Sequence, residues 1–291
     1  MALLKRSSTR KRDNEGRMPL MEHLRELRNR LLKAILAIAG GTVLGFVIFD
    51  PIWAFLKEPY CRLPQSHQLD KGTCTLVVNG VFDAFMVNLK VALIFGIIVS
   101  APLWLYQIWA FVTPGLYQNE RRYTLSFLGL AVPLFLGGSA LAYFIMDKGL
   151  ALLLGFAPVD VIPLLSMGEY LNFALAMLVI FGVSFELPLL LVFLNVIGVL
   201  RFQTVAKHQR MVIFGMFVFS AVATPSQDPI SMLSLAVPMV VLFLLAEVFM
   251  YFRDRKRDVE EAERQRRLEE ELNTPGPSPL DEDEFEDSAR D

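Results

Sequence analysis

The chain has 291 residues, of which 54% are hydrophobic, and its mean hydropathy is +0.45. This composition excludes one large soluble domain and indicates a protein embedded in a membrane. The formal net charge is only −2, but the basic residues are strongly sorted by position along the chain.

The chain begins with a basic segment that precedes the first apolar run. Residues 1–18 are basic and polar and are predicted to be disordered. Residues 19–30 are predicted to form a short interfacial helix, because leucines recur there at spacings of three and four. The alternative is a cleaved signal peptide, which the long apolar run and the lack of a small-residue cleavage site after Pro51 disfavour.

Six apolar runs approach the roughly 20 residues that a helix needs to cross a bilayer. They cover about 31–50, 85–112, 123–146, 169–198, 209–223 and 230–252. Prolines inside four of these runs predict bent helices; they are Pro102, Pro133, Pro188 and Pro238. The expected fold is an all-α integral membrane protein, a curved bundle of six transmembrane helices with short fifth and sixth spans.

The third and fifth runs have further local features. Gly137, Gly138 and Ser139 are small residues that allow another backbone to approach the third span closely. The fifth run has only about 13 apolar residues, which at 1.5 Å per residue is well short of a 30 Å hydrocarbon core. Such a helix thins the bilayer or leans on partners.

The basic residues indicate the orientation. Residues 1–30 carry nine Lys and Arg residues, and the connections 113–122 and 199–210 carry two and three. The tail beyond 252 begins with four more in its first five residues. The alternate connections carry four in all, in 51–84, 147–168 and 224–229. The positive-inside rule therefore predicts that both termini are cytoplasmic.

The first outer connection and the tail complete the organisation. Cys61 and Cys74 both fall in the outer connection, where one disulfide is favoured over two unpaired thiols. Residues 75–79 of that connection fit either an extended segment or a helix start. The tail is predicted to be a charged helix over 253–272 and a disordered acidic segment over 273–291, neither with assigned chemistry.

Five sequence blocks resemble a known family. They read HLRELRNRL (23–31), SAPLWLYQIWAF (100–111), LYQNERR (116–122), FGVSFELP (181–188) and ATPSQDPIS (223–231). Together they resemble TatC, the multispanning subunit of the twin-arginine protein translocase, in a membrane domain over 19–252. The resemblance implies a signal-peptide receptor and assembly platform in the bacterial cytoplasmic membrane, which exports folded proteins using the proton-motive force. No cofactor and no enzymatic activity are implied.

The same resemblance implies the partners. They are single-span membrane proteins of the TatA/TatB type, the twin-arginine signal peptides of folded precursors, further copies of the chain in a receptor complex, and the lipid bilayer, with no nucleic acid.

Two glutamates among arginines are the candidate binding residues. Glu26 and Glu120 each adjoin a membrane-length apolar run and match the family glutamates implicated in binding the signal peptide. A carboxylate can accept a bidentate hydrogen bond from a guanidinium, so the chemistry suits an arginine pair. Arg28, Arg121 and Arg122 match family positions too and are expected to hold the carboxylates in place. The alternative is an ordinary interfacial cluster of salt bridges.

Four further residues match family positions. Gln107 and Phe111 are expected near the signal site, and Phe111 either contacts the apolar part of the peptide or simply packs at the interface. Pro59 is expected to shape the outer connection, and Asp228 lies on the outer side after the fifth span.

The chain departs from the family pattern near the sixth span. Met232 stands where a glutamine is common, and Gln227 and Pro229 alter the turn before it. The polar contact to a partner helix that the family suggests is therefore replaced here by an expected apolar docking surface around Met216 and Val218.

Glu186 lies deep in the fourth apolar run. A carboxyl at such a depth costs roughly 2.5–3.5 kcal/mol on insertion scales and is a functional candidate by default. The resemblance implies that it faces the concave side of the bundle and takes part in translocation. The alternative is a neutral, hydrogen-bonded acid that braces helix packing.

Two other classes of function were weighed. An intramembrane enzyme is disfavoured because the three histidines lie in tails or loops and 182–186 lacks the second glycine of a Gly-x-Ser-x-Gly motif. A proton-coupled solute carrier would suit kinked helices and Glu186, but no internal repeat relates the two halves.

Overall fold

The computed structural model describes residues 20–67, 74, 76–78, 80–112, 120–158 and 165–273, apart from the side chains of 20, 22, 65, 67 and 120–124. Within these ranges the chain is almost entirely helical. The elements are α1 (Leu20–Val47), α2 (Phe49–Cys61), η1 (Pro64–His67), α3 (Asp83–Val99), α4 (Ala101–Val112), α5 (Glu120–Gly155), α6 (Met167–Val196), α7 (Phe202–Lys207), α8 (Gln209–Ala223) and α9 (Pro229–Asn273). The predicted tails 1–18 and 274–291 lie outside the described residues.

Membrane-length helices account for most of the fold. Four of the described helices, α1, α5, α6 and α9, are long and apolar enough to cross a bilayer. The helices α3 and α4 together make a fifth candidate, and α8 is a shorter apolar helix of 15 residues. Each of the six apolar runs is therefore helical, and the fifth is short, as the sequence predicts.

The second apolar run is broken rather than gently bent. The axes of α3 and α4 meet at 58°, and Ser100 separates them. Pro102 has no N–H to continue the ladder of α3. At the break, the Gly96 carbonyl accepts both the Ser100 N–H at 3.0 Å and the Ser100 hydroxyl at 2.6 Å. The other three prolines lie inside uninterrupted helices, namely Pro133 in α5, Pro188 in α6 and Pro238 in α9.

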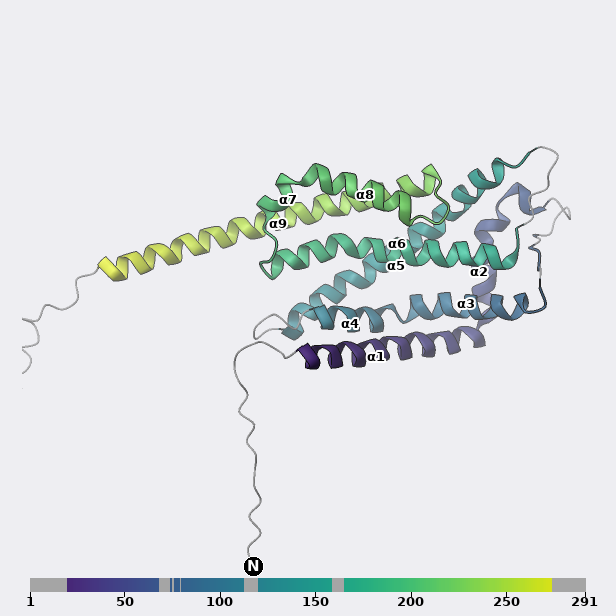
Figure 1. Ribbon diagram of the computed structural model, residues 1–291, viewed down its shortest axis with the longest axis horizontal. Helices are drawn as coiled ribbons and strands as arrows, with labels where there is room; N and C mark the ends of the chain where they lie inside the picture. Colours follow the sequence, from purple (N-terminus) through teal and green to yellow (C-terminus); the bar gives the residue numbers. More distant parts are fainter. Residues whose placement is uncertain are drawn as a thin grey trace, which may run out of the picture.

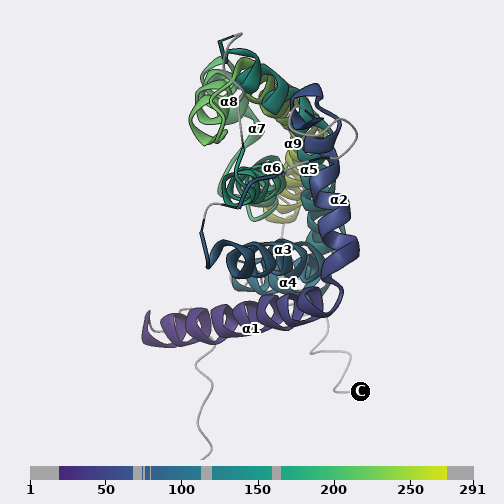
Figure 2. The same cartoon turned by 90° about the vertical axis from the view of Figure 1, so that its right-hand side faces the viewer.

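The helices are stacked in successive layers (Figures 1 and 2). The helix α1 packs on α3 and α4, α3 packs on α6, and α6 packs on α9, which in turn contacts α8. The long helix α5 contacts α4, α6, α9 and α2, so it ties the layers together. The helix α6 contributes to both clusters of buried side chains, with Phe181 in one and Phe193 in the other.

The contact between α5 and α6 is a backbone-to-backbone approach. A Cβ added to Gly138 would lie 2.5 Å from the Phe181 carbonyl oxygen, and Ser139 donates to the Leu178 carbonyl at 3.0 Å. Hydrocarbon gives helices little hydrophobic reason to associate, so close van der Waals packing must hold them together. The close approach predicted from the glycine-rich sequence is confirmed.

The two ends of the bundle differ in character. The start of α1, the end of α4 and the extension of α9 lie at one end, whereas α2 lies toward the other (Figure 1). At the α2 end, Val77 forms an isolated parallel bridge with Ser166. The segment around Val77, which the sequence left open between extended and helical, is therefore extended at this residue.

The sixth apolar run does not end as a separate helix. α9 continues for 45 residues from the apolar stretch into the charged one. Asp254 anchors it where the charges begin, because its carboxylate accepts from Asn195 Nδ2 at 3.0 Å and from the Phe202 N–H at 2.7 Å. The predicted charged helix over 253–272 is thus the continuation of the sixth membrane helix.

Candidate functional site

The first turns of α1 hold Glu26 against Arg30. Arg30 Nε donates to Glu26 Oε1 at 2.9 Å, and Nη2 donates to the same oxygen at 2.5 Å. Residues four apart lie on one face of a helix, so α1 itself brings the pair together. The two side chains are about three-quarters buried, at 24% and 23% exposure, so they are less screened by solvent than a surface pair.

The second oxygen of Glu26 is different. Oε2 is buried and accepts no hydrogen bond from the described residues. The residue Glu26 is part of the lining of a hollow of about 570 Å³ between α1 and α4, which is lined by Arg25, Glu26, Asn29, Arg30, Lys33, Tyr106 and Gln107. A carboxylate offers about four lone-pair positions, so Glu26 retains acceptor capacity for another donor.

The helix α4 supplies the opposite wall. Gln107 lines the hollow, and Phe111, one turn further on, stacks on His23 of α1 with ring centroids 4.5 Å apart and an angle of 16°. The structure therefore brings three predicted site residues, Glu26, Gln107 and Phe111, to one α1–α4 junction. His23 and Tyr106 also lie at this junction, although neither was predicted from the sequence to be a site residue.

The arginine that holds Glu26 is not the one expected. Arg28 is exposed, and the hydrogen bond described for its side chain goes to Asn29 Oδ1 at 3.5 Å. Arg30 takes the expected role because it is four residues from Glu26, whereas Arg28 is two residues away and points to another side of the helix. Helical spacing was the signal in the sequence that could have identified Arg30.

The second predicted glutamate cannot be placed in the same way. The helix α5 begins at Glu120, so Glu120, Arg121 and Arg122 form its first turn. Their side chains, together with residues 113–119, lie outside the described residues. The meeting of Glu26 and Glu120 at one site stays a prediction.

Glu186 lies on α6 beside α4. Both of its carboxyl oxygens are shielded from solvent, and the side chain of Trp109 lies near the carboxyl group. Trp109 is two residues beyond Gln107, or about 200° around α4, so the two side chains leave the helix on nearly opposite sides. The helix α4 therefore separates Glu186 from the hollow beside Glu26.

A second intramembrane acid was missed by the sequence analysis. Glu247 lies on α9 with only 8% of its surface exposed. It falls inside the apolar run 230–252, which is the predicted sixth span. An acid inside an apolar run was the available signal, the same one that singled out Glu186.

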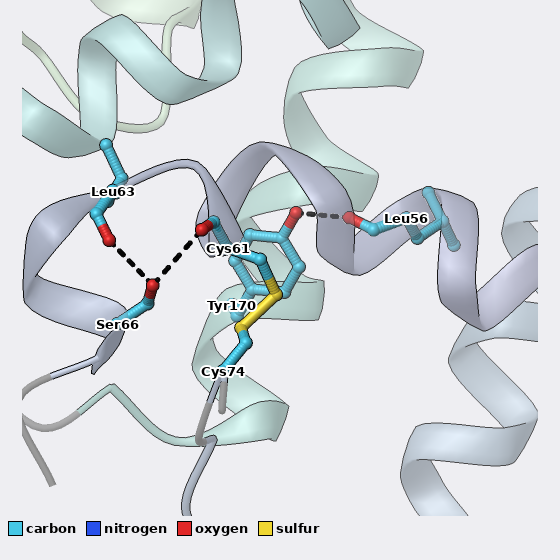
Figure 3. The surroundings of a disulfide bond; sticks show 6 residues. All are labelled: Leu56, Cys61, Leu63, Ser66, Cys74 and Tyr170. Carbon is cyan, nitrogen blue, oxygen red and sulfur yellow. Dashed lines mark hydrogen bonds between the residues drawn. A yellow bond between two sulfur atoms is a disulfide. The ribbon is translucent and has the colours of Figure 1, made fainter. Parts of the chain in front are cut away.

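The α2 end of the bundle is held by a disulfide and a network of hydrogen bonds (Figure 3). Cys61 and Cys74 are bonded with their Cα atoms 5.4 Å apart, which agrees with the pairing favoured from the sequence. The Tyr170 hydroxyl, from α6, donates to the Leu56 carbonyl, and Pro59 is buried in α2 between these contacts. Ser66 donates to the Leu63 carbonyl at 2.6 Å.

A charged contact fastens α2 to α5 at the same end. Glu58 accepts from Arg62 at 2.8 Å and from the Tyr143 hydroxyl at 3.2 Å. The hydrogen bond from Arg62 is the largest cause of a lowered pKa for Glu58.

Asp228 caps the start of α9. Its Oδ1 accepts the Ser231 N–H at 2.7 Å, and its Oδ2 accepts from the Ser226 hydroxyl. Pro229 occupies the first helical position, where a missing N–H costs nothing. Gln227 adopts a positive φ of 48°, so the departure from the family pattern at this residue coincides with a left-handed turn. Met216, expected on an outer docking surface, is instead buried in the core.

Comparisons with known proteins agree on one family. A profile described as Sec-independent protein translocase protein (TatC) matches residues 22–238. The chain belongs to the TatC family. It is therefore a component of a protein translocase and a multi-pass membrane protein.

Individual relatives extend over most of the chain. TatC from Frankia casuarinae is 45% identical over 247 residues, covering 83% of this chain and 68% of the relative. TatC from Corynebacterium kroppenstedtii is 40% identical, covering 84% of this chain and 64% of the relative. A crystal structure of the twin arginine translocase receptor TatC in DDM superposes with a TM-score of 0.64 at 30% identity. That likeness covers 78% of this chain and 99% of the crystallised one.

The TatC fold puts the described site in context. Among the described residues, no group of three or more His, Cys, Asp or Glu side chains is placed to hold a metal ion. The residues gathered at the α1–α4 junction are instead donors, acceptors and aromatic rings, which suit the binding of a peptide.

Proposed function

We propose that this TatC protein is the receptor for twin-arginine signal peptides and the platform on which the translocase assembles. It binds precursors of folded proteins at the inner surface of the bacterial cytoplasmic membrane. Export is driven by the proton-motive force. Single-span partners of the TatA/TatB type and further copies of the chain complete the complex.

The buried Oε2 of Glu26 is the observation that carries this proposal. A buried acceptor without a donor costs roughly 1–3 kcal/mol, or more when it is charged, and the described residues leave this hydrogen bond of Glu26 unmet. An incoming guanidinium would supply that hydrogen bond while Arg30 keeps Oε1. Glu120, predicted to come near, would receive the second arginine of the pair.

The charges around the hollow favour a site that selects arginine over lysine rather than one that attracts any cationic peptide. Within the described lining of the hollow, Arg25, Arg30 and Lys33 are basic and Glu26 alone is acidic. A cationic peptide gains little from long-range attraction there, so binding depends on the directed hydrogen bonds of a planar guanidinium. Lysine has a compact ammonium group and cannot reproduce that geometry.

The orientation of the chain supports a cytoplasmic site. The residues that line the hollow belong to the first turns of α1 and to α4. The start of α1 and the end of α4 lie at the same end of the bundle as the charged extension of α9 (Figure 1). These are the segments that the positive-inside rule assigns to the cytoplasm. A precursor would then meet the site before it is translocated.

The partner surface is proposed on α8 and α9. The short α8 presents Phe214 and Val222 outward, at 68% and 77% exposure, while Val218 is about half exposed. A helix of 15 residues is too short for the hydrocarbon core, and a partner helix would relieve the mismatch. Met216 faces the other way and is not part of this surface.

The experiment that tests the receptor role is peptide binding to detergent-solubilised protein. Fluorescence anisotropy of a labelled twin-arginine signal peptide is compared for wild type, Glu26→Gln and Arg28→Gln. Glu26→Gln removes a charge-assisted hydrogen bond, which contributes roughly 1.5–3 kcal/mol. The variant should therefore bind the peptide roughly tenfold more weakly than wild type, or weaker still. Arg28→Gln is the matched control, because Arg28 is exposed and lies outside the lining of the hollow.

A twin-lysine peptide provides the second arm of the experiment. The twin-lysine peptide should bind wild type weakly. Its affinity for Glu26→Gln should be only slightly lower than its affinity for wild type. Equal binding of both peptides, or equal binding by wild type and Glu26→Gln, would contradict the proposed receptor chemistry.

A further inference from the structure

A groove on the membrane-facing surface between α5, α6 and α9 has no role in the proposed receptor function. It has a volume of about 490 Å³, and its walls include Leu130 of α5, Leu189 and Val192 of α6, and Leu245 and Phe249 of α9. Leu130 and Leu245 are more than half exposed. The groove ends at Arg253, the first charged residue after the apolar part of α9.

Arg253 is unusual among the basic residues at this boundary. Its side chain is half-buried, and Nη2 donates to the carbonyl of Val196, the last residue of α6, at 3.1 Å. Within the described part of the chain Arg253 makes no ion pair, and none of the described residues that line the groove is acidic. A guanidinium has five N–H donors, so most of its capacity is unused there.

A cation at the mouth of an apolar groove calls for an anion with an apolar tail. Burial of an unpaired charge is costly, and a phosphate would accept a bidentate hydrogen bond from the guanidinium. Basic pockets between transmembrane helices commonly bind phospholipid head groups. We propose that the groove holds one acyl chain of an anionic glycerophospholipid, with the lipid phosphate at Arg253.

The length and the lining of the groove suit an acyl chain. From Leu242 to Arg253 the groove follows α9 for roughly 16 Å, at 1.5 Å per residue. Its described lining is apolar apart from Ser126 and Arg253, so it offers an acyl chain apolar contacts along its length and offers the lipid phosphate a guanidinium at one end.

The test is lipid binding to the purified full chain, measured by native mass spectrometry from a neutral detergent. The probes are palmitoyl-oleoyl phosphatidylglycerol, the matching phosphatidylcholine and the matching diacylglycerol. Wild type should retain phosphatidylglycerol more tightly than either of the others, because only it combines a phosphate with a net negative charge.

Two variants separate the head-group and acyl-chain contacts. Arg253→Gln should weaken the binding of phosphatidylglycerol roughly tenfold, to the level of diacylglycerol. Leu245→Trp, at an exposed position in the groove, should obstruct the chain and weaken all three lipids. Arg255→Gln is the matched control, because Arg255 lies at the same membrane boundary but outside the groove. Melting temperatures close to that of wild type establish that the variants are folded.

Two results would overturn the proposal. One is retention of phosphatidylglycerol by Arg253→Gln or Leu245→Trp at the wild-type level. The other comes from a photo-crosslinking residue placed at position 245 in native membranes. Crosslinks to lipid support the proposal, whereas crosslinks to the membrane helix of another protein would show that the groove is a protein interface.

Discussion

The two oxygen atoms of Glu26 have different surroundings, although they belong to one carboxylate. Arg30 donates two hydrogen bonds to Oε1, and Oε2 is buried without a donor from the described residues. The salt bridge therefore positions the carboxylate without using it up. Arg30 also keeps the charge of Glu26 compensated while the site is empty, which lowers the cost of burying a carboxylate.

At the residue scale, Glu186 should affect translocation and not recognition. Glu186→Ala removes an acid that lies across α4 from the hollow, so the contacts of Glu26 and Gln107 should persist. We expect transport into membrane vesicles to be strongly impaired while binding of the twin-arginine peptide stays within about twofold of wild type. Normal transport by the variant would remove Glu186 from the mechanism.

Asp228 gives a second prediction at this scale. Asp228→Ala removes the cap of α9 and should destabilise the protein by roughly 0.5–2 kcal/mol, whereas Asp228→Asn retains capping capacity and should cost less. Thermal unfolding in detergent at neutral pH would measure both. Equal melting temperatures for wild type and Asp228→Ala would show that the cap contributes nothing.

The pH dependence follows from the same residue. Burial alone would raise the pKa of Asp228, but hydrogen bonds from Ser226 and Ser231 outweigh it and leave the pKa below its ordinary value. The resulting stability is fully present above the unfolded pKa of about 3.9 and is lost as pH falls through the lower folded pKa. When the pH is lowered from above the unfolded pKa of about 3.9 to below the folded pKa of Asp228, the melting temperature of wild type should therefore fall more than that of Asp228→Asn.

At the scale of elements, the α5–α6 contact rests on two small residues facing each other. Gly138 faces the backbone at Phe181, and Gly182 approaches the Phe135 ring and the Ser139 hydroxyl. These contacts fix the separation of the two helices, and they hold Glu186 on α6 at its depth in the bundle. The glycine contacts between α5 and α6 thus position Glu186 without contacting it.

Neighbouring glycines allow this contact to be tested with an internal control. Gly138→Ala would place a Cβ 2.5 Å from the Phe181 carbonyl oxygen, a backbone atom that cannot swing aside. Overpacking of this kind costs roughly 1–3 kcal/mol, so the melting temperature should fall by several degrees. Gly137→Ala meets nothing within 4 Å and should be neutral or slightly stabilising. Equal effects of the two substitutions would argue against a close α5–α6 contact.

The sequence predicts these elements better than it predicts their partners. Apolar length identified all six apolar helical segments, and glycine spacing identified the close approach at Gly138, because both are local properties of the chain. The role of Arg30 follows from helical spacing but was assigned to Arg28 by family position. The prediction that Met216 forms part of a docking surface was wrong, because the side of α8 that faces α9 is decided by tertiary packing. Nothing local in the sequence could show that His23 stacks on Phe111.

On the scale of the whole molecule, the structure sorts its features between two ends. The hollow beside Glu26, the connection after α6 and the α9 extension occupy one end, and the disulfide and the Asp228 cap belong to connections assigned to the other. This sorting agrees with the distribution of Lys and Arg, from which the positive-inside rule predicts that the first end is cytoplasmic.

The disulfide provides a direct test of that orientation. In intact cells, a membrane-impermeant phosphine should reduce the Cys61–Cys74 bond, and an impermeant maleimide should then label both thiols. The Cys61→Ser/Cys74→Ser double variant is the labelling control, because the sequence holds no other cysteine. Labelling that requires permeabilised membranes would reverse the proposed topology.

The uninterrupted course of α9 has a mechanical consequence. Roughly 20 of its residues extend past Arg253, which is about 30 Å of helix at 1.5 Å per residue. No joint separates this rod from the membrane segment, so a tilt of about 10° within the bilayer would displace its far tip by roughly 5 Å. The hydrogen bonds of Asp254 to Asn195 and Phe202 form the fulcrum of that lever. Small rearrangements among the membrane helices would thereby be magnified at a charged tip well clear of the lipid surface.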